Sequence, residues 1–525
     1  MPKILVTEKI GAAGLEALQQ RFEVEQRLDL TPEQLKELLP SYDALIVRSQ
    51  TKVTADVLER GTNLRVVGRA GAGVDNIDSE AATRQGILVV NAPGANSVAV
   101  AELVIGLLIG IARHIPQAHA SLAAGKWERN AFMGWEVRDK TLGLLGFGRI
   151  GSEVARRARA LEMRVLAYDP FISAERAQQL GVQPVTLDAL LQQSDVISIH
   201  TPLTETTRNS LNAERLAQMK RGAFIINAAR GGIIDEAALL EALESGQIGG
   251  AALDVWAKEP PKDNLLVGHP RVIGLPHLGA STREAQALTS ADVAEGVIDA
   301  LEGRTPRYAV NAPFVAPEAW QTVAPYVALG RLLARLANQI IETPARAYEI
   351  VYGGELADTT TDPIRLAVLS GLLEDVTETR VTPVNAALLA RDRGLTVAEH
   401  KQPDAERYAA LLELRVTTSD GRTHSFGGTA VNDEPHIVQV DGYWLDVVPS
   451  EAMLFTFHQD RPGLIGMVGT ILGAADVNIS SMHVGRQAPR GQAIMVLTVD
   501  EPVPGDLLRQ IEQEADIARA ISVQL

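Results

Sequence analysis

The chain has 525 residues, too many for one hydrophobic core, and this length predicts three or four domains. Its formal net charge is −16, with no basic run to offset it, which argues against nucleic acid or an anionic membrane as a partner. The sequence contains no cysteine, so disulfides, thiolate zinc sites and cysteine nucleophiles are excluded, and a reducing, cytoplasmic location is expected.

Residues 1–96 show the pattern of a small parallel sheet. Short β-branched runs alternate with helical or turn segments, and this alternation predicts a flavodoxin-like α/β domain. The first run begins at residue 4, and the start of the chain has none of the features of a signal peptide. Loops after three of these strands carry Arg48, Arg69 with Gly71, and Asn96. They are either ordinary turns with solvated arginines or an anion pocket built from guanidinium groups and glycine amides.

Residues 97–117 predict a buried helix. Its apolar run at 103–112 is about half as long as a membrane span, which favours a core helix over a transmembrane one. The loop that follows contains Lys126, Trp127 and Arg129. This loop is either a solvated connector or the carrier of another cation for the substrate.

Residues 141–169 carry a dinucleotide-binding signature. An apolar strand, the glycine turn GFGRIG and a helix follow one another, and a second strand then leads to an aspartate. The three glycines permit, in turn, a tight turn, close approach of a pyrophosphate, and close packing of the helix on the strand. The aspartate is placed to bind a ribose 2′-OH and would repel a 2′-phosphate, so a Rossmann-type doubly wound domain that binds NAD is predicted. The cofactor residues expected here are Gly146, Gly148, Arg149, Ile150, Gly151 and Asp169.

Four further strands are predicted downstream, and each ends in a polar loop. Because the carboxyl ends of parallel strands lie at one edge of a sheet, we expect these loops to converge on the cofactor crevice. No spacing of His, Asp and Glu suggests a metal site, and no Gly-x-Ser-x-Gly elbow occurs. The loop residues expected near the cofactor are His200, Thr201, Pro202, Ala228, Asp254, His277 and Gly279.

Arg230, Glu259 and His277 form a set suited to hydride transfer. A hydroxy acid loses its hydroxyl proton as a hydride leaves carbon, and the imidazole of His277 is suited to accept that proton. Glu259 would stabilise the imidazolium and orient the ring, while the planar fork of Arg230 could hold a carboxylate and the reacting oxygen. Taken singly, each residue also fits a structural role in a loop. Only their joint position beside one cofactor site favours catalysis.

Four motifs within residues 1–310, GFGRIG, NAARGGIIDEAALLEAL, ALDVWAKEP and LPHLGAST, resemble the D-isomer-specific 2-hydroxyacid dehydrogenase family. The resemblance implies that Arg230, Glu259 and His277 are catalytic and that Asp254 holds the nicotinamide carboxamide. It also implies two domains: a substrate-binding domain of residues 1–96 and 296–314, and an NAD-binding domain of residues 97–295.

The segments VRSQTKVT, VGRAGAGVDNID and KWERNAFMG are similar to members of this family that oxidise 3-phosphoglycerate with NAD. The resemblance implies a homo-oligomer, with a dimer through the NAD-binding domains and a tetramer overall. Two rival functions stay open: a hydroxypyruvate or glyoxylate reductase on the same scaffold, and a non-catalytic sensor gated by a dinucleotide. The substrate ligands implied by the resemblance are Arg48, Arg69, Gly71, Asn96 and, across the dimer interface, Arg129.

Residues 315–450 change character after a linker-like stretch. Two helical segments are followed by alternating runs, with hairpin turns expected at Asp420-Gly421 and Asp441-Gly442. The residues themselves predict a small α+β domain. The region resembles the intervening domain of long-form family members, which can serve as an anion effector site.

Residues 451–525 alternate as β-α-β-β-α-β, and the segment FHQDRPGLIGMVGTILGAADVNISSMHVGR resembles an ACT domain. Such ferredoxin-like regulatory modules bind amino acids where two copies meet. In similar dehydrogenases the effector is L-serine, which implies His458, Asp460 and Asn478 as its ligands. Asp460 could instead cap the helix that follows it.

Overall fold

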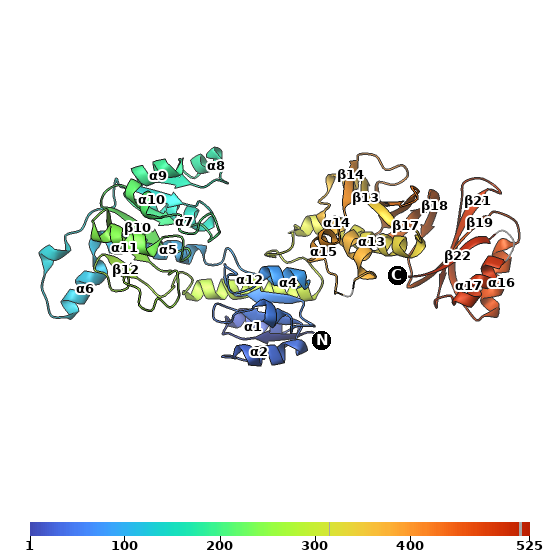
Figure 1. The fold of residues 1–525 in the computed structure, drawn as a ribbon, viewed down its shortest axis with the longest axis horizontal. Coiled ribbons are helices and arrows are strands. Elements are labelled where there is room, and N and C mark those ends of the chain that lie inside the picture. The colour runs from blue at the N-terminus through green and yellow to red at the C-terminus, as the bar shows by residue number, and fades with distance from the viewer. Residues whose placement is uncertain (314, 378, 514–516) are drawn as a thin grey trace.

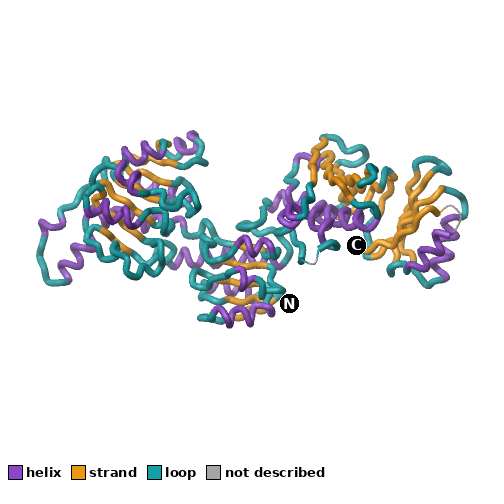
Figure 2. Tube along the Cα trace, viewed as in Figure 1, coloured by secondary structure: helices purple, strands orange, loops and turns teal. Residues whose placement is uncertain are grey.

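The computed structural model describes residues 1–313, 315–377, 379–513 and 517–525, which form four units (Figure 1). The two units nearest the N-terminus are parallel sheets with helices on both faces. The two C-terminal units are richer in strands and carry their helices on one face of the sheet (Figure 2). The predicted α/β fold class with two C-terminal α+β units is therefore confirmed.

The first unit is a five-stranded parallel sheet. Its elements are β1 (Lys3–Val6), α1 (Ala12–Gln19), β2 (Glu23–Gln26), α2 (Pro32–Leu38), η1 (Leu39–Ser41), β3 (Ala44–Val47), α3 (Ala55–Leu58), β4 (Val66–Arg69), α4 (Ser79–Arg84) and β5 (Leu88–Val90). The strand order β2-β1-β3-β4-β5 is that of flavodoxin-like folds. The apolar runs bury on both faces, as β3 shows with four buried residues.

The long helix α12 (Arg283–Leu301) completes this first unit, although it lies far away in the sequence. Its Val293, Val297 and Leu301 belong to the same buried cluster as β1 and β3. A side chain at Gly14 of α1 would collide with the backbone of Ser290, so the two helices pack closely there. The packing therefore differs from our prediction that residues up to 295 stay with the NAD-binding domain.

The second unit is a seven-stranded parallel sheet. Its elements are α5 (Ser97–Arg113), α6 (Ile115–Ala123), η2 (Arg129–Phe132), β6 (Thr141–Leu145), α7 (Arg149–Ala160), β7 (Arg164–Tyr168), α8 (Ala174–Gln179), β8 (Gln183–Pro184), α9 (Leu187–Gln193), β9 (Val196–Ile199), α10 (Ala213–Gln218), β10 (Ala223–Asn227), α11 (Glu236–Glu244), β11 (Ile248–Leu253) and β12 (Val272–Gly274). The order β12-β11-β10-β9-β6-β7-β8 is doubly wound about β6, as in Rossmann-type folds. The glycine turn after β6 therefore lies where the strand order reverses.

The helix predicted at 97–117 ends earlier than expected. His114 adopts a left-handed backbone conformation with φ of 51°, which ends α5 at Arg113 and starts α6 in a new direction. Among the described residues no single helix is long and apolar enough to cross a bilayer; α5 and α6 meet that test only as a pair bent by 64°.

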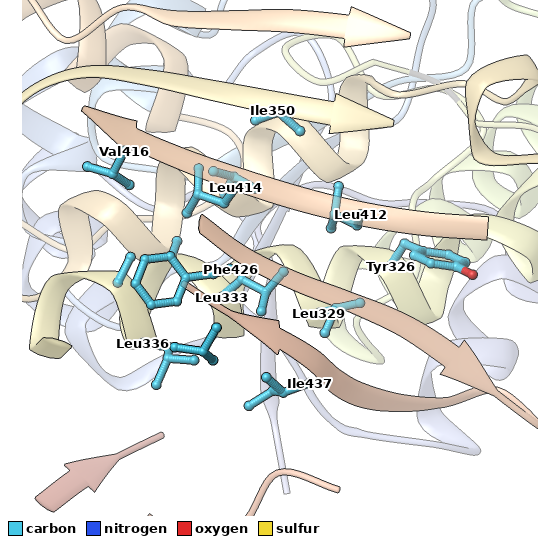
Figure 3. Packing of buried hydrophobic residues seen from close by; sticks show 14 of the residues in the cluster. Tyr326, Leu329, Leu333, Leu336, Ile350, Leu412, Leu414, Val416, Phe426 and Ile437 are labelled. Carbon is cyan, nitrogen blue, oxygen red and sulfur yellow. The ribbon is translucent and has the colours of Figure 1, made fainter. Parts of the chain in front are cut away.

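The third unit packs helices on one face of a six-stranded mixed sheet. Its elements are α13 (Pro317–Ile340), β13 (Ala345–Gly354), η3 (Glu355–Asp358), α14 (Asp362–Glu374), α15 (Ala386–Asp392), β14 (Val397–Gln402), β15 (Ala410–Thr418), β16 (Thr423–Val431), β17 (Glu434–Val440) and β18 (Tyr443–Val447). Leu329 and Leu333 of α13 meet Leu414 and Phe426 of the sheet in its core (Figure 3). Among the described residues of this unit, three α-helices and the short η3 are present where two helical segments were predicted. Both predicted Asp-Gly hairpin turns are confirmed.

The fourth unit has the predicted β-α-β-β-α-β order. Its elements are β19 (Ala452–Gln459), α16 (Leu464–Ala474), β20 (Ile479–Arg486), β21 (Gln492–Val499), α17 (Gly505–Gln513) and β22 (Ile517–Gln524). The antiparallel order β20-β21-β19-β22 is ferredoxin-like. One face of this sheet carries α16 and α17. The other face, with Phe455 and Val496, shares a hydrophobic core with the third unit.

Candidate active site

A cleft of about 1130 Å³ lies between the first and second units, at the carboxyl ends of their strands. Parallel sheets place ligands at this edge, and both sheets present it to the same cleft. The sequence-predicted residues that line it are Arg48, Arg69, Gly71, Asn96, Ile150, His200, Thr201, Pro202, Ala228, Arg230, Asp254, Glu259, His277 and Gly279.

Each of the three glycines in the turn has its own steric role. Gly146 has φ of 94°, and a Cβ there would lie 2.8 Å from the carbonyl of His200. A Cβ at Gly151 would lie 2.6 Å from the oxygen of Gly146, so the start of α7 packs tightly on the turn. Gly148, the N-cap of α7, has no atom within 4 Å of its missing side chain. A pyrophosphate could therefore approach the helix N-terminus there.

Asp169 stands just beyond the end of β7 and is fixed by backbone amides. Its Oδ2 accepts a hydrogen bond from Phe147 of the glycine turn at 2.8 Å, and its Oδ1 accepts one from Phe171 at 2.9 Å. Each oxygen of a carboxylate has a further lone pair. Asp169 can therefore accept ribose hydroxyls beside the turn.

Several buried polar atoms in the cleft have no hydrogen-bond partner among the described residues. They include Nδ1 of His200, Oγ1 of Thr201 and Oδ1 of Asn96. Burial lowers the pKa of His200 to about 4, so its ring is neutral near pH 7, with Nε2 placed 2.9 Å from Ser198 Oγ. Buried polar atoms normally have partners, so these atoms are suited to bind a polar ligand. Together with the open space at Gly148, they fit NAD.

His277 and Glu259 form a hydrogen-bonded pair. Nδ1 of His277 lies 2.8 Å from Oε2 of Glu259, which leaves Nε2 for a reacting group. The His277 loop is fixed by Asp254, a fully buried residue whose carboxylate accepts hydrogen bonds from the amides of Leu278 at 2.6 Å and Gly279 at 2.8 Å. The main-chain oxygen of Asp254 also accepts the amide of His277 at 2.8 Å. Asp254 thus sets the position of the imidazole.

Glu236, which was not predicted as a site residue, holds the loop that carries Glu259. Its Oε1 accepts the amide of Ala257 at 2.7 Å, and its Oε2 accepts the side chain of Asn264 at 2.8 Å. The neighbouring Asp235 caps α11, as its place before the helix indicates. The sequence did contain a signal for Glu236: two acidic residues stand at the start of this helix, and a helix needs only one of them as its cap.

The opposite wall of the cleft is rich in cations. Arg69 is largely buried, its Nε has no partner among the described residues, and burial together with repulsion from Arg230 lowers its pKa. The Arg48 loop is held by Glu8, whose carboxylate accepts three backbone amides from residues 48–51. Burial alone would raise the pKa of Glu8, but these amides lower it overall. Polar cleft residues that were not predicted as site residues include Lys9, Lys52, Asp75 and Asn76.

Arg129 does not lie in this cleft. It is exposed on η2, after a helix, α6, with no buried residue. Large apolar side chains are exposed along the same arm, among them Leu122, Trp127 and Met133. Within one chain the structure therefore does not bring Arg129 to the predicted substrate residues.

The three expected effector residues lie at two ends of the fourth unit. His458 pairs with Ala493, whereas Asn478 precedes β20 and bonds to Asp500 at 2.8 Å, beyond the other end of β21. Six residues of strand, about 20 Å, separate these ends. His458 is buried, which lowers its pKa. One copy of the unit thus cannot place all three around one amino acid.

Asp460 does not cap α16, whose N-cap is Gly463. Instead its Oδ2 accepts the amide of Arg490 at 3.2 Å and lies 3.1 Å from Nη1 of Arg486. These contacts lower the pKa of Asp460, the amide contributing most. The helix-cap alternative is therefore wrong.

Three sequence families match the chain. They are the NAD binding domain of D-isomer specific 2-hydroxyacid dehydrogenases at residues 105–279, the D-3-phosphoglycerate dehydrogenase intervening domain at 322–441, and the ACT domain at 452–516. These matches confirm the predicted resemblances to the dehydrogenase family, to its intervening domain and to the ACT domain. The NAD prediction is confirmed with them.

Relatives named D-3-phosphoglycerate dehydrogenase match over the full length of the chain. The D-3-phosphoglycerate dehydrogenase of Synechocystis sp. is 45% identical over 526 residues, covering 100% of this chain and 95% of the relative. That of Methanocaldococcus jannaschii is 43% identical over 526 residues, covering 100% of both. Among solved structures, a glyoxylate reductase from Paecilomyes thermophila has a TM-score of 0.56 and 32% identity, covering 98% of its own chain but 59% of this one.

Proposed function

The chain belongs to the D-3-phosphoglycerate dehydrogenases of the D-isomer-specific 2-hydroxyacid dehydrogenase family, and on that premise we propose that it oxidises D-3-phosphoglycerate to 3-phosphohydroxypyruvate with NAD, the first step of serine biosynthesis. The observation that carries the proposal is the His277–Glu259 pair, which shares one cleft with the largely buried Arg69 and with Arg230. A base and a cluster of guanidinium groups are what an acidic hydroxy acid requires.

The reaction assigns a different task to each side of the cleft. Arg230 holds the carboxylate and the C2 oxygen of the substrate, while Arg48 and Arg69 hold the phosphate. Nε2 of His277 takes the hydroxyl proton, and Glu259 stabilises the imidazolium that forms. Bound NAD would accept the hydride from C2. In the reverse direction the imidazolium returns the proton to the carbonyl oxygen.

We propose that a dimer through the NAD-binding domains completes the site. Helix α6 and the segment after it, up to the end of η2, expose apolar side chains that a second copy would bury. Arg129 lies in this segment, at the start of η2. Mixing Arg129→Ala chains with His277→Ala chains should restore turnover, because one cleft of each heterodimer then has both residues. Activity that stays at the level of the separate variants would show that Arg129 does not act across the interface.

We also propose that L-serine inhibits the enzyme at the ACT unit, between two copies, so that His458 and Asp460 of one copy face Asn478 of the other. Their separation within one chain supports an interfacial site, and pairing of such interfaces would give a tetramer. Asn478→Ala should abolish serine inhibition and leave turnover without serine unchanged. An enzyme that does not respond to serine from the outset would contradict this.

A substrate panel tests the assignment. With NAD, 3-phosphoglycerate should be oxidised with kcat/KM well above that of unphosphorylated 2-hydroxy acids, since these acids lack the phosphate that we assign to Arg48 and Arg69. Preferred reduction of glyoxylate or hydroxypyruvate would favour the rival reductase. We further propose a cytoplasmic location, which fractionation of cells would test.

A further inference from the structure

Asp75 connects the two walls of the cleft. Its Oδ2 accepts a hydrogen bond from Nε of Arg230 at 3.0 Å, although 155 positions separate the two residues in the sequence. Asp75 lies in the loop after β4 of the first unit, and Arg230 lies in the loop after β10 of the second. The ion pair therefore spans the cleft at the residue that we propose to bind the substrate's carboxylate.

The contacts of the guanidinium show which of its edges Asp75 occupies. Nη1 donates to the main-chain oxygen of Ala229 at 2.8 Å. Nη2 packs against Gly73, where a Cβ would collide with it and would lie 2.7 Å from Oδ2 of Asp75. The edge formed by Nε and Nη2 thus faces the 73–75 loop. A carboxylate that binds arginine through both oxygens needs such an edge, and here Asp75 takes its Nε.

The backbone beside Asp75 is held in place, whereas its side chain can move. Nδ2 of Asn76 donates to the main-chain oxygens of Arg48 at 2.8 Å and Thr51 at 2.7 Å, which ties the loop to the wall that we assign to the phosphate. The side chain of Asp75 itself is 66% exposed. An ion pair this exposed contributes little free energy, so a stronger anion can displace the carboxylate into solvent.

We propose that Asp75 is an internal competitor for the substrate's carboxylate, which pairs with Arg230 before substrate binds and rotates away when the substrate takes its place. This inference rests on the proposed function, in which Arg230 binds the carboxylate of a 2-hydroxy acid. Asp75 then determines specificity, because only a ligand with an anionic group beside the reacting carbon can replace the ion pair that Arg230 loses when Asp75 moves away.

The test compares Asp75→Asn with the wild type, using NAD and 3-phosphoglycerate. The variant keeps the shape of the side chain and removes the charge, so KM for 3-phosphoglycerate should fall by about twofold to fivefold, the range expected for an exposed pair, with kcat unchanged. Asp78→Asn is the matched control. Asp78 lies on the same loop and caps α4 through the amide of Ala81, a role that asparagine also fills, so its KM should stay at the wild-type value.

Two further measurements distinguish a loss of the Asp75 charge from misfolding. They are the KM of a second variant, Asp75→Ser, and the Kd for NADH, measured by nucleotide fluorescence. Both variants should bind NADH as the wild type does and should both lower KM for the acid. If the wild type turns over 3-phosphoglycerate and the variants raise KM or lower kcat, Asp75 supports Arg230 and the competitor role is wrong. If the wild type does not oxidise 3-phosphoglycerate, the proposed function itself fails.

Discussion

Replacing Glu259 by glutamine keeps the size of the side chain and removes the charge that we propose stabilises the imidazolium of His277. Oε2 lies 2.8 Å from Nδ1 of His277, and Oε1 accepts the amide of Trp256 at 3.2 Å. A hydrogen bond to a charged group contributes about 1.5–3 kcal/mol. The two side chains are 49% and 39% exposed, so solvent screening lowers the estimate to about 1–2 kcal/mol. We therefore expect kcat to fall by about 5- to 30-fold.

The assay is the initial rate of NADH formation from 3-phosphoglycerate across pH. The variant lacks the charge that would stabilise the imidazolium as the proton is transferred, so its kcat should lie below that of the wild type across the pH range. Glu244→Gln, at the exposed end of α11, is the control for loss of one negative charge. A Glu259→Gln enzyme with wild-type kcat would refute the role of the pair.

Three further changes test the surroundings of the site. Gly148→Val should raise KM for NAD by about tenfold or more and leave the melting temperature unchanged. Gly146→Ala should lower the melting temperature, because Gly146, unlike Gly148, has a positive φ and crowded surroundings. The reverse pattern would contradict the roles of the two glycines. Glu236→Gln should lower kcat by about threefold to tenfold through the loop that carries Glu259, with the Kd for NADH unaltered; unchanged kcat would mean that other contacts hold the loop. Burial lowers the pKa of His200 from 6.5 to about 4, so its contribution to stability is present above pH 6.5 and is lost as the pH falls towards 4. The melting temperature of the wild type should therefore fall more steeply across that interval than that of His200→Asn, and parallel curves would show that His200 does not titrate in this way.

Strand patterns and the glycine motif were sufficient to predict the two parallel sheets and most of the site residues. The glycine turn, its aspartate and the polar strand ends all belong to one parallel sheet, whose geometry requires them to meet. The return of α12 to the first unit depends on a close contact between Gly14 and Ser290, residues 276 positions apart. No periodicity within either helix carries that information.

The site residues that were not predicted either act through other residues or contact a residue far away in the sequence. Glu8 and Glu236 bind only backbone amides or a neighbouring side chain, so neither resembles a site residue in the sequence. Asp75 faces Arg230 only because the first and second units share one cleft. Arg129 and Asn478 remain apart from their expected partners, since a single chain does not contain the interfaces at which we propose that they act.

The most direct measurement of the central claim is NADH formation from 3-phosphoglycerate by wild-type enzyme and by His277→Ala, with 3-phosphohydroxypyruvate trapped. We expect robust turnover by the wild type and a kcat lower by roughly 10²–10⁴-fold in the variant, because the variant lacks the proposed base for the hydroxyl proton. Near-normal turnover by His277→Ala would contradict the account.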